Sequence, residues 1–213
     1  MHDAWLERWK TGRIGWHEAD GNRRLRDHWQ ASGRRVLVPM CGKSVDMLWL
    51  AEQGNAVVGV EVSGIAVQAF FADNGLDYEE YHGNRHRFVA IDHDITIICG
   101  DYFAISDMRF DACYDRGAFA ALPAAMRANY AAHTNALLDD GAYHLLITLE
   151  YDQGLVEGPP YSIAADEVLG FWPDLERVEV VDDIDNAPPK FHDAGVAEML
   201  EVCWRSPATM APR

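Results

Sequence analysis

The stretch Val36-Leu37-Val38-Pro39-Met40-Cys41-Gly42-Lys43-Ser44 decides the fold, together with Val57-Val58-Gly59-Val60-Glu61 further along the chain. The first apolar run ends in proline and glycine, a helical pattern follows, and the second apolar run ends in an acid. This order is typical of a strand–turn–helix–strand unit that holds a nucleotide-like ligand at the carboxyl edge of a sheet. The turn allows close backbone approach, and the acid can accept hydrogen bonds from a ribose.

Strands and helices alternate along most of the chain, which predicts a single α/β domain spanning residues 1–213. We expect a seven-stranded, mostly parallel sheet with helices on both faces, in which residues 1–32 form a helical lid and residues 33–213 the α/β core. Predicted helices span 45–53, 63–74, 123–138 and 164–171. Predicted strands span 35–40, 56–62, 95–99, 110–114, 142–149, 177–181 and 198–204, with a hairpin arm at 86–91. The last two strands lie too close in sequence for a crossover helix, so an antiparallel edge is expected.

The composition restricts the class of ligand. A chain of 213 residues is long enough for one domain with a full core. Its formal net charge of −16 argues against nucleic-acid partners and anionic membranes, since both need a basic surface. The N-terminus does not read as a secretion signal, no apolar run is long enough to span a membrane, and the four cysteines are scattered. We therefore expect a cytoplasmic protein with reduced thiols and a small-molecule ligand.

Two phosphate sites are considered at the turn after the first strand. Gly42-Lys43-Ser44 matches the end of a phosphate-binding loop, but that motif needs a glycine at the position of Leu37. A dinucleotide site would need glycines that the turn lacks. Neither site therefore fits the sequence.

S-adenosylmethionine suits the turn better, because it has a ribose and an adenine but no phosphate. Glu61 supplies a ribose acid. Asp101-Tyr102-Phe103, after the third parallel strand, supplies a polar group for the adenine edge and a ring to stack on it. Both segments follow strand carboxyl ends, where open α/β sheets bind ligands.

Six segments in this order resemble one known family. They are 5–9 (WLERW) with 15–18 (GWHE), 37–47 (LVPMCGKSVDM), 59–63 (GVEVS), 99–103 (CGDYF), 114–118 (YDRGA), and 151–152 (YD) with 158–161 (GPPY). On these residues the chain resembles the thiopurine S-methyltransferase family over nearly its whole length. The resemblance implies a Rossmann-like class I methyltransferase fold, S-adenosyl-L-methionine as cofactor with S-adenosyl-L-homocysteine as product, and methyl transfer to the sulfur of aromatic or heterocyclic thiols.

The resemblance also implies cofactor contacts. Trp9 is similar to the tryptophan that closes over the methionine end of the cofactor, and Met40 to the apolar residue in the turn below it. Glu61 matches the ribose-binding acid. Asp101 and Tyr102 match the pair that contacts the adenine.

Two further residues are implied at the acceptor. Arg116 matches the arginine that lines the pocket near both cofactor and acceptor, and it could favour the anionic tautomer of a heterocycle. Trp16 stands where the family commonly has phenylalanine, so we expect a narrower acceptor slot. Asp115 beside Arg116 is either an assisting group or one half of a structural ion pair.

The chemistry needs no obligatory general base, because a thione or thiolate is already a soft nucleophile. The enzyme would accelerate the methyl transfer by aligning the two sulfur atoms and by excluding water. Trp5 and Trp9 could hold the sulfonium by cation–π attraction. The aromatic N-terminal residues, Trp16 included, are equally compatible with packing of a helix onto the core.

Three other features carry no predicted chemistry. His82 and His86 have no further ligand nearby in sequence, so no metal site is predicted. Cys41 lacks a nearby base and is interpreted as a small buried residue. The acidic run at 182–185 is interpreted as a solvated loop.

Alternative functions remain open. One keeps the cofactor and changes the acceptor to selenium or tellurium compounds or a small natural thiol. The other is a non-catalytic module that binds the cofactor. In each case we expect a monomer.

Overall fold

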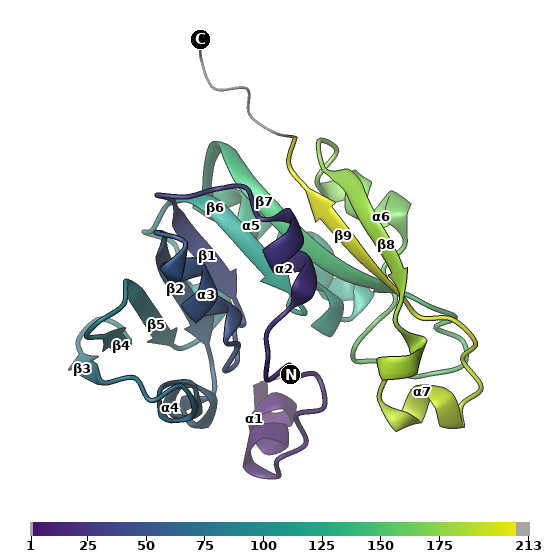
Figure 1. Cartoon of the computed structure of the whole chain (residues 1–213), viewed down its shortest axis with the longest axis horizontal. Helices are drawn as coiled ribbons and strands as arrows, with labels where there is room; N and C mark the ends of the chain where they lie inside the picture. The colour runs from purple at the N-terminus through teal and green to yellow at the C-terminus, as the bar shows by residue number, and fades with distance from the viewer. Residues whose placement is uncertain (1, 208–213) are drawn as a thin grey trace.

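The computed structural model describes residues 2–207, in which nine strands form one open sheet in the order β3-β4-β5-β2-β1-β6-β7-β9-β8 (Figure 1). The pairs β5–β2, β2–β1, β1–β6 and β6–β7 are parallel, and the pairs at both edges are antiparallel. The strands are β1 (Arg35–Pro39), β2 (Ala56–Glu61), β3 (Tyr78–His82), β4 (His86–Ala90), β5 (Ile95–Cys99), β6 (Phe110–Arg116), β7 (Leu138–Glu150), β8 (Glu176–Asp182) and β9 (Leu200–Arg205).

The prediction of an α/β sheet with an antiparallel edge is confirmed, but the strand number of seven is wrong. The hairpin β3–β4 extends the sheet beyond β5, and all five residues of β3 are exposed. An exposed strand has no buried face, so it lacks the apolar alternation by which strands are recognised in a sequence.

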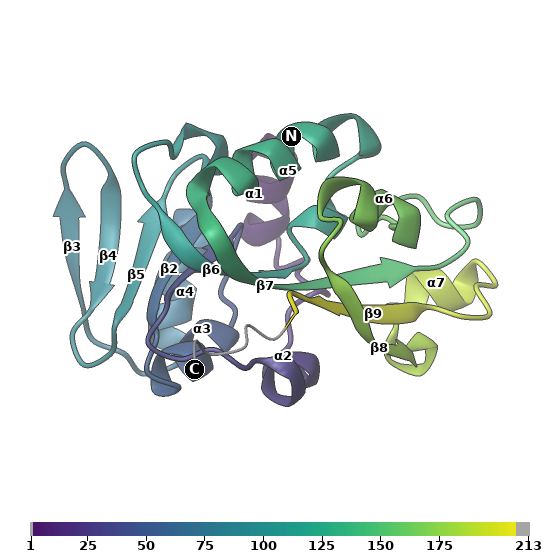
Figure 2. The ribbon, with the colours of Figure 1, turned by 90° about the horizontal axis from the view of Figure 1, so that it is seen from above.

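Helices cover both faces of the sheet, as predicted. In Figure 2, α5 and α6 lie on one side of the sheet, and α2, α3 and α4 on the other. The α-helices are α1 (His2–Lys10), α2 (Arg23–His28), α3 (Asp46–Glu52), α4 (Gly64–Asp73), α5 (Ala124–Leu137), α6 (Ala165–Phe171) and α7 (Pro189–Asp193). Short 3-10 turns are η1 (Tyr102–Ala104), η2 (Phe119–Ala121) and η3 (Ile184–Asn186). No helix between residues 2 and 207 is long and apolar enough to cross a membrane.

Alternation along the central strand builds the two halves of the core. Leu37 packs into the layer with Tyr130 of α5, whereas Val36 and Val38 pack into the layer with Met47 of α3. Successive side chains of a strand point to opposite faces, so a parallel strand covered on both sides reads as a continuous apolar run. The run Val36–Val38 is buried for this reason.

The strand ends that face α1 carry the unusual backbone. Met40 follows β1 with a φ of 46°, and Gly42 has a φ of 55°. A non-glycine residue in the left-handed region costs on the order of 1–2 kcal/mol. Local strain of this kind is characteristic of ligand sites, which places the candidate site at this edge.

Candidate active site

A cavity of about 650 Å³ lies where the strand ends meet the N-terminal helix. One wall comes from the segments that follow β1, β2, β5 and β6, and the other from α1 and the loop after it. In Figure 1, α1 lies below the carboxyl ends of β1 and β6. Further lining comes from segments late in the chain, namely Pro159, Pro160, Asp183, Asn186, Pro188, Lys190, Phe191, Met199 and Glu201.

The turn after β1 forms the floor of the cavity against Trp9. The Trp9 side chain is buried, and a Cβ placed on Gly42 would lie 3.2 Å from its Cζ2 atom. The glycine therefore allows both the left-handed backbone and the close approach of the indole ring. Met40 lines the same cavity. The structure thus brings Trp9, Met40 and Gly42 together at the cavity.

Glu61 is a buried acid at the cavity wall. Its side chain is only 6% exposed, and it accepts a hydrogen bond from the backbone N–H of Gly42 at 2.9 Å and from that of Ser63 at 2.7 Å. Ser63 is also the N-cap of α4. Two backbone donors fix the carboxylate at the junction of β2 and α4, so it lies in a rigid position on the cavity wall.

The turn after β5 carries the expected adenine pair. Asp101 lines the cavity and caps η1 by accepting the N–H of Phe103 at 3.0 Å. Tyr102 lines the cavity too, but its ring is buried in the core and its hydroxyl lies 2.8 Å from Thr134 Oγ1. Burial raises the pKa of this phenol. The Tyr102 ring also packs against Tyr130 and His133, so little of the residue is open to the cavity.

Arg116 connects the end of β6 to the N-terminal loop. Its Nη1 donates to the carbonyl oxygen of Trp16 at 2.7 Å, and its Nη2 forms an ion pair with Glu18. The carboxylate of Glu18 raises the pKa of Arg116 against the opposing effect of burial. Arg116 thus lines the cavity and also holds the loop that carries Trp16.

Asp115 does not enter the cavity. Neighbouring residues of a strand point to opposite faces, so Asp115 points away from the side that Arg116 faces. Its fully buried carboxylate accepts bonds from the N–H groups of Ala118 and Phe119 and from the Tyr130 hydroxyl at 2.7 Å. Burial raises its pKa to about 6. Among the described residues, the ion-pair partner of Arg116 is Glu18, and the Asp115 carboxylate instead accepts the N–H groups of Ala118 and Phe119.

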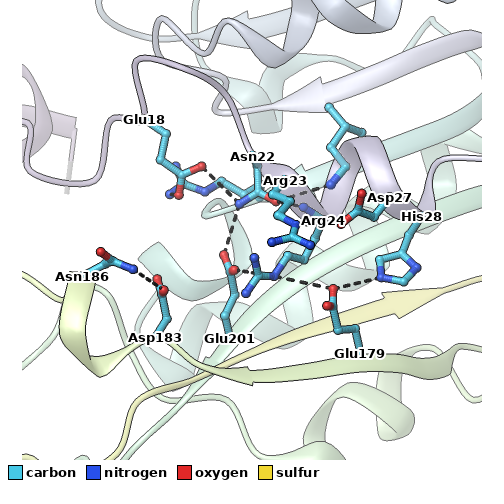
Figure 3. Close-up of polar contacts among 12 residues, drawn as sticks. Glu18, Asn22, Arg23, Arg24, Asp27, His28, Glu179, Asp183, Asn186 and Glu201 are labelled. Atoms are coloured by element: carbon cyan, nitrogen blue, oxygen red, sulfur yellow. Dashed lines mark hydrogen bonds and ion pairs between the residues drawn. The ribbon is translucent and has the colours of Figure 1, made fainter.

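Asn22 links three elements beside the cavity (Figure 3), and the sequence did not predict this connection. Its amide Nδ2 donates at 3.1 Å to both Glu18 and Glu201, and its backbone N–H donates at 2.7 Å to Asp46. Burial raises the pKa of Glu201, which also pairs with Arg24 at 3.0 Å. These contacts join the N-terminal segment to α3 and β9. The spacing of 179 positions between Asn22 and Glu201 explains why no local pattern indicates them.

Part of the cavity lining is aromatic and basic. The Trp16 ring lies edge-on to those of Trp5 and Trp9, with centroids at 5.1 Å and 5.9 Å. The guanidinium of Arg8 lies 4.9 Å from the Trp5 centroid. Lys190 also lines the cavity, and its Nζ donates to the backbone carbonyls of Glu157 and Pro159. The three tryptophans therefore pack on one another and line the cavity at the same time.

Two remaining sequence interpretations can now be assessed. Burial and the charge of Glu61 raise the pKa of Cys41 well above its usual value, so its thiol is protonated and unsuited to attack. In the acidic run, Asp182 accepts backbone bonds from Ile184 and Met199 at 3.1 Å, and Asp183 lines the cavity. Asp182 and Asp185 are exposed, in agreement with a solvated segment, and the cavity contact of Asp183 was not predicted.

The fold is that of the S-adenosylmethionine-dependent methyltransferases. The chain superposes on the 1,6-didemethyltoxoflavin-N1-methyltransferase of Burkholderia thailandensis, which holds S-adenosylhomocysteine, with a TM-score of 0.63 and 16% identity over 96% of this chain and 86% of that one. It superposes on an S-adenosylmethionine-dependent methyltransferase of Mesorhizobium loti with a TM-score of 0.56 and 18% identity over 88% and 100% of the two chains. The described sheet and the predicted class of fold agree.

Sequence relatives define the family more closely. The profile of the thiopurine S-methyltransferase family matches residues 1–207. The thiopurine S-methyltransferase of Bordetella petrii is 40% identical over 95% of this chain and 96% of its own length. That of Pseudomonas putida is 42% identical over 92% of this chain and 94% of its own length. The chain belongs to the thiopurine S-methyltransferase family, which confirms the resemblance and S-adenosylmethionine as cofactor.

Proposed function

We propose that this protein transfers the methyl group of S-adenosylmethionine to the sulfur of an aromatic or heterocyclic thiol or thione. The observation that carries the proposal is one cavity shared by a fixed ribose-type acid, Glu61, and an aromatic wall that includes Trp16. The first suits the cofactor and the second a flat acceptor. The names of the sequence relatives support the same reaction.

The residues present fit the cofactor. Glu61 presents a carboxylate whose position is fixed by two backbone donors, as binding of two ribose hydroxyls requires. Gly42 leaves no side chain between the turn and the Trp9 ring, so the backbone can approach the methionine end. We assign Glu61 to the ribose, Asp101 and Tyr102 to the adenine, and Met40 with Trp9 to the methionine end.

The bound cofactor supplies an electrophilic methyl group on a sulfonium. The contribution of the protein is to align the acceptor sulfur with that methyl group and to exclude water. Alignment of two reactants is worth up to about 7–11 kcal/mol of the barrier. Cation–π attraction between the tryptophan faces and the sulfonium would contribute on the order of 0.5–2 kcal/mol to its binding. Trp5 and Trp9 are the assigned rings.

No residue is assigned as a general base. Asp115 has a pKa raised to about 6 by burial, but its carboxylate is enclosed by three protein donors outside the cavity. Burial, followed by the charge of Lys43, lowers the pKa of His17, which lines the cavity and is neutral at pH 7. A thiolate or thione acceptor needs no proton removed at the moment of transfer. Arg116, compensated by Glu18, is assigned to positioning the loop that carries Trp16 and to lining the acceptor end.

The test is turnover on a panel of acceptors. Purified protein with S-adenosylmethionine is incubated with an aromatic thiol, a heterocyclic thione, selenite and tellurite, and methylated products are measured by mass spectrometry. We expect sulfur methylation of the first two, and Trp16→Phe should raise the kcat/KM for bulkier rings because the slot widens. Methylation only of the selenium or tellurium compounds would refute the acceptor. Tight cofactor binding without turnover on any acceptor would indicate a binding module.

Two features of the solution state complete the proposal. We propose a monomer without nucleic-acid partners, which the net charge of −16 supports. A cytoplasmic location is supported by the four free cysteines. Light scattering of the purified chain should give one 23.9 kDa species, and a dimer mass would contradict the first point.

A further inference from the structure

The structure assigns a second site, outside the cavity, to the β3–β4 hairpin. We propose that Glu80, His82 and His86 bind a divalent transition metal ion of the zinc class at the surface. The sequence argued against a metal here because no third ligand was apparent beside the two histidines. The hairpin supplies that third ligand from the strand that the sequence did not predict.

Strand geometry places all three side chains on one face. Glu80 and His82 are two positions apart on β3, and residues two apart on a strand share a face. His82 lies directly opposite His86 in the antiparallel register, and paired residues also share a face. The two imidazole rings are stacked, with centroids 4.6 Å apart.

The potential ligand atoms converge on a small volume. One ligand atom from each residue lies within 4.8 Å of the others. The Nε2 atoms of His82 and His86 lie 3.3 Å and 2.5 Å from the same oxygen, Glu80 Oε1. A tetrahedral ion with bonds of about 2.0–2.2 Å needs ligand atoms about 3.3–3.6 Å apart, so small rotations about side-chain bonds would open the cluster to that spacing.

The chemistry of the ligands selects the ion. Two imidazole nitrogens and one carboxylate oxygen are ligands of zinc, and imidazole also suits copper and nickel. Glu80 and His86 are about one-third exposed and His82 is 74% exposed, which leaves water access to a fourth position. The three side chains already hold one another in place, so little ordering is required on binding.

The hairpin site is connected to the cavity through the sheet. His86 is paired with Cys99, the last residue of β5, and Asp101 of the cavity follows two residues later. A bound ion would bridge β3 to β4 and thus stabilise an edge of the sheet whose outer strand, β3, is exposed throughout. The site does not depend on methyl transfer, so it stands or fails separately from the proposed function.

The test is titration of the full chain, without an affinity tag, with zinc sulfate by calorimetry. We expect one ion per chain at this site, and a rise in the thermal midpoint with zinc that a chelator reverses. His82→Ala and Glu80→Gln should each weaken zinc binding about tenfold or more. Even the loss of a residue that only hydrogen-bonds to a metal ligand lowers metal affinity by about 10–100-fold. His82 is exposed, so its replacement should leave the apo thermal midpoint unchanged.

His192→Ala is the matched control, because His192 is exposed on α7 and belongs to no such cluster among residues 2–207. It should bind zinc as tightly as the unchanged protein. Equal zinc affinity in the control and in both hairpin variants would overturn the proposal, as would the absence of a binding isotherm. In either case the contacts of Glu80 would be hydrogen bonds alone.

Discussion

Replacement of Glu61 by glutamine tests the central assignment of the site. Glutamine keeps the shape of the side chain and one carbonyl oxygen, but turns an NH₂ group toward one of the two backbone N–H groups that Glu61 accepts at 2.9 Å and 2.7 Å. A hydrogen bond to a charged group is worth about 1.5–3 kcal/mol. The unfolding free energy should fall by that amount, which lowers the thermal midpoint by about 3–12 °C for a chain of this length.

The same change should also weaken the binding of S-adenosylhomocysteine, because the ribose hydroxyls lose a charged hydrogen-bond acceptor. A loss of about 1.5–3 kcal/mol corresponds to about 10- to 150-fold in Kd. Calorimetric titration and thermal unfolding measure the two effects on the same samples. Glu52→Gln, at the exposed end of α3, removes the same charge and should change neither quantity. A lowered midpoint with Kd unchanged within about twofold would make Glu61 a purely structural acid and refute its assignment to the ribose.

Three further predictions address the turn, a buried histidine and the loop. Gly42→Ala should lower the unfolding free energy by about 1–2 kcal/mol and also weaken the binding of S-adenosylhomocysteine. Gly54 has a φ of 82° and no neighbour within 4 Å, so Gly54→Ala should lower stability alone. Urea unfolding and calorimetric titration measure the two effects. Burial lowers the pKa of His144 to about 4. The unfolding free energy should therefore fall by up to about 3 kcal/mol as pH drops from 6.5 toward 4. His144→Phe should lessen that fall, measured by urea unfolding at pH 4.5 and 7. An equal decline in both proteins would contradict it. Glu18→Gln breaks the ion pair at the end of β6 and should cost under about 1 kcal/mol of stability while raising the acceptor KM, and an unchanged KM would remove the loop from acceptor binding.

The centre of the sheet was predictable because its local patterns and its packing agree. The run Val36–Val38 is apolar and lies on a strand covered on both faces, and Ser63 follows Glu61 as a helix cap both in the pattern and in the structure. Predicted helices at 45–53 and 63–74 match α3 and α4 to within one residue at each end. Periodicity identifies elements whose burial is regular.

Elements with irregular burial were missed. The strand β3 is exposed throughout, and α7 is a short helix that follows Pro188 and begins at Pro189. The strand β7 begins at Leu138, directly after α5, whereas the prediction started it at residue 142. The start was missed because residues 139–141 read Asp-Asp-Gly, which is typical of a turn. In each case the tertiary environment sets the conformation, and a local window carries no signal for it.

The candidate site divides in the same way. Residues at strand ends, such as Glu61 and Asp101, follow from position alone, since parallel strands deliver their carboxyl ends to one edge. The directions of side chains did not follow. Asp115 and Arg116 are neighbours in sequence, yet Asp115 accepts backbone N–H groups in the interior and Arg116 lines the cavity.

The bond from Asn22 to Glu201 has a consequence for biosynthesis. Glu201 belongs to β9, the last strand of the described chain, and 179 positions separate it from Asn22. During synthesis the N-terminal loop can reach Asp46 and Arg116 before β9 leaves the ribosome, but its contact with Glu201 can form only after that strand has been made. The cavity wall is thus complete only with β9, and a nascent chain that ends before Leu200 would lack the part of the wall that Glu201 contributes.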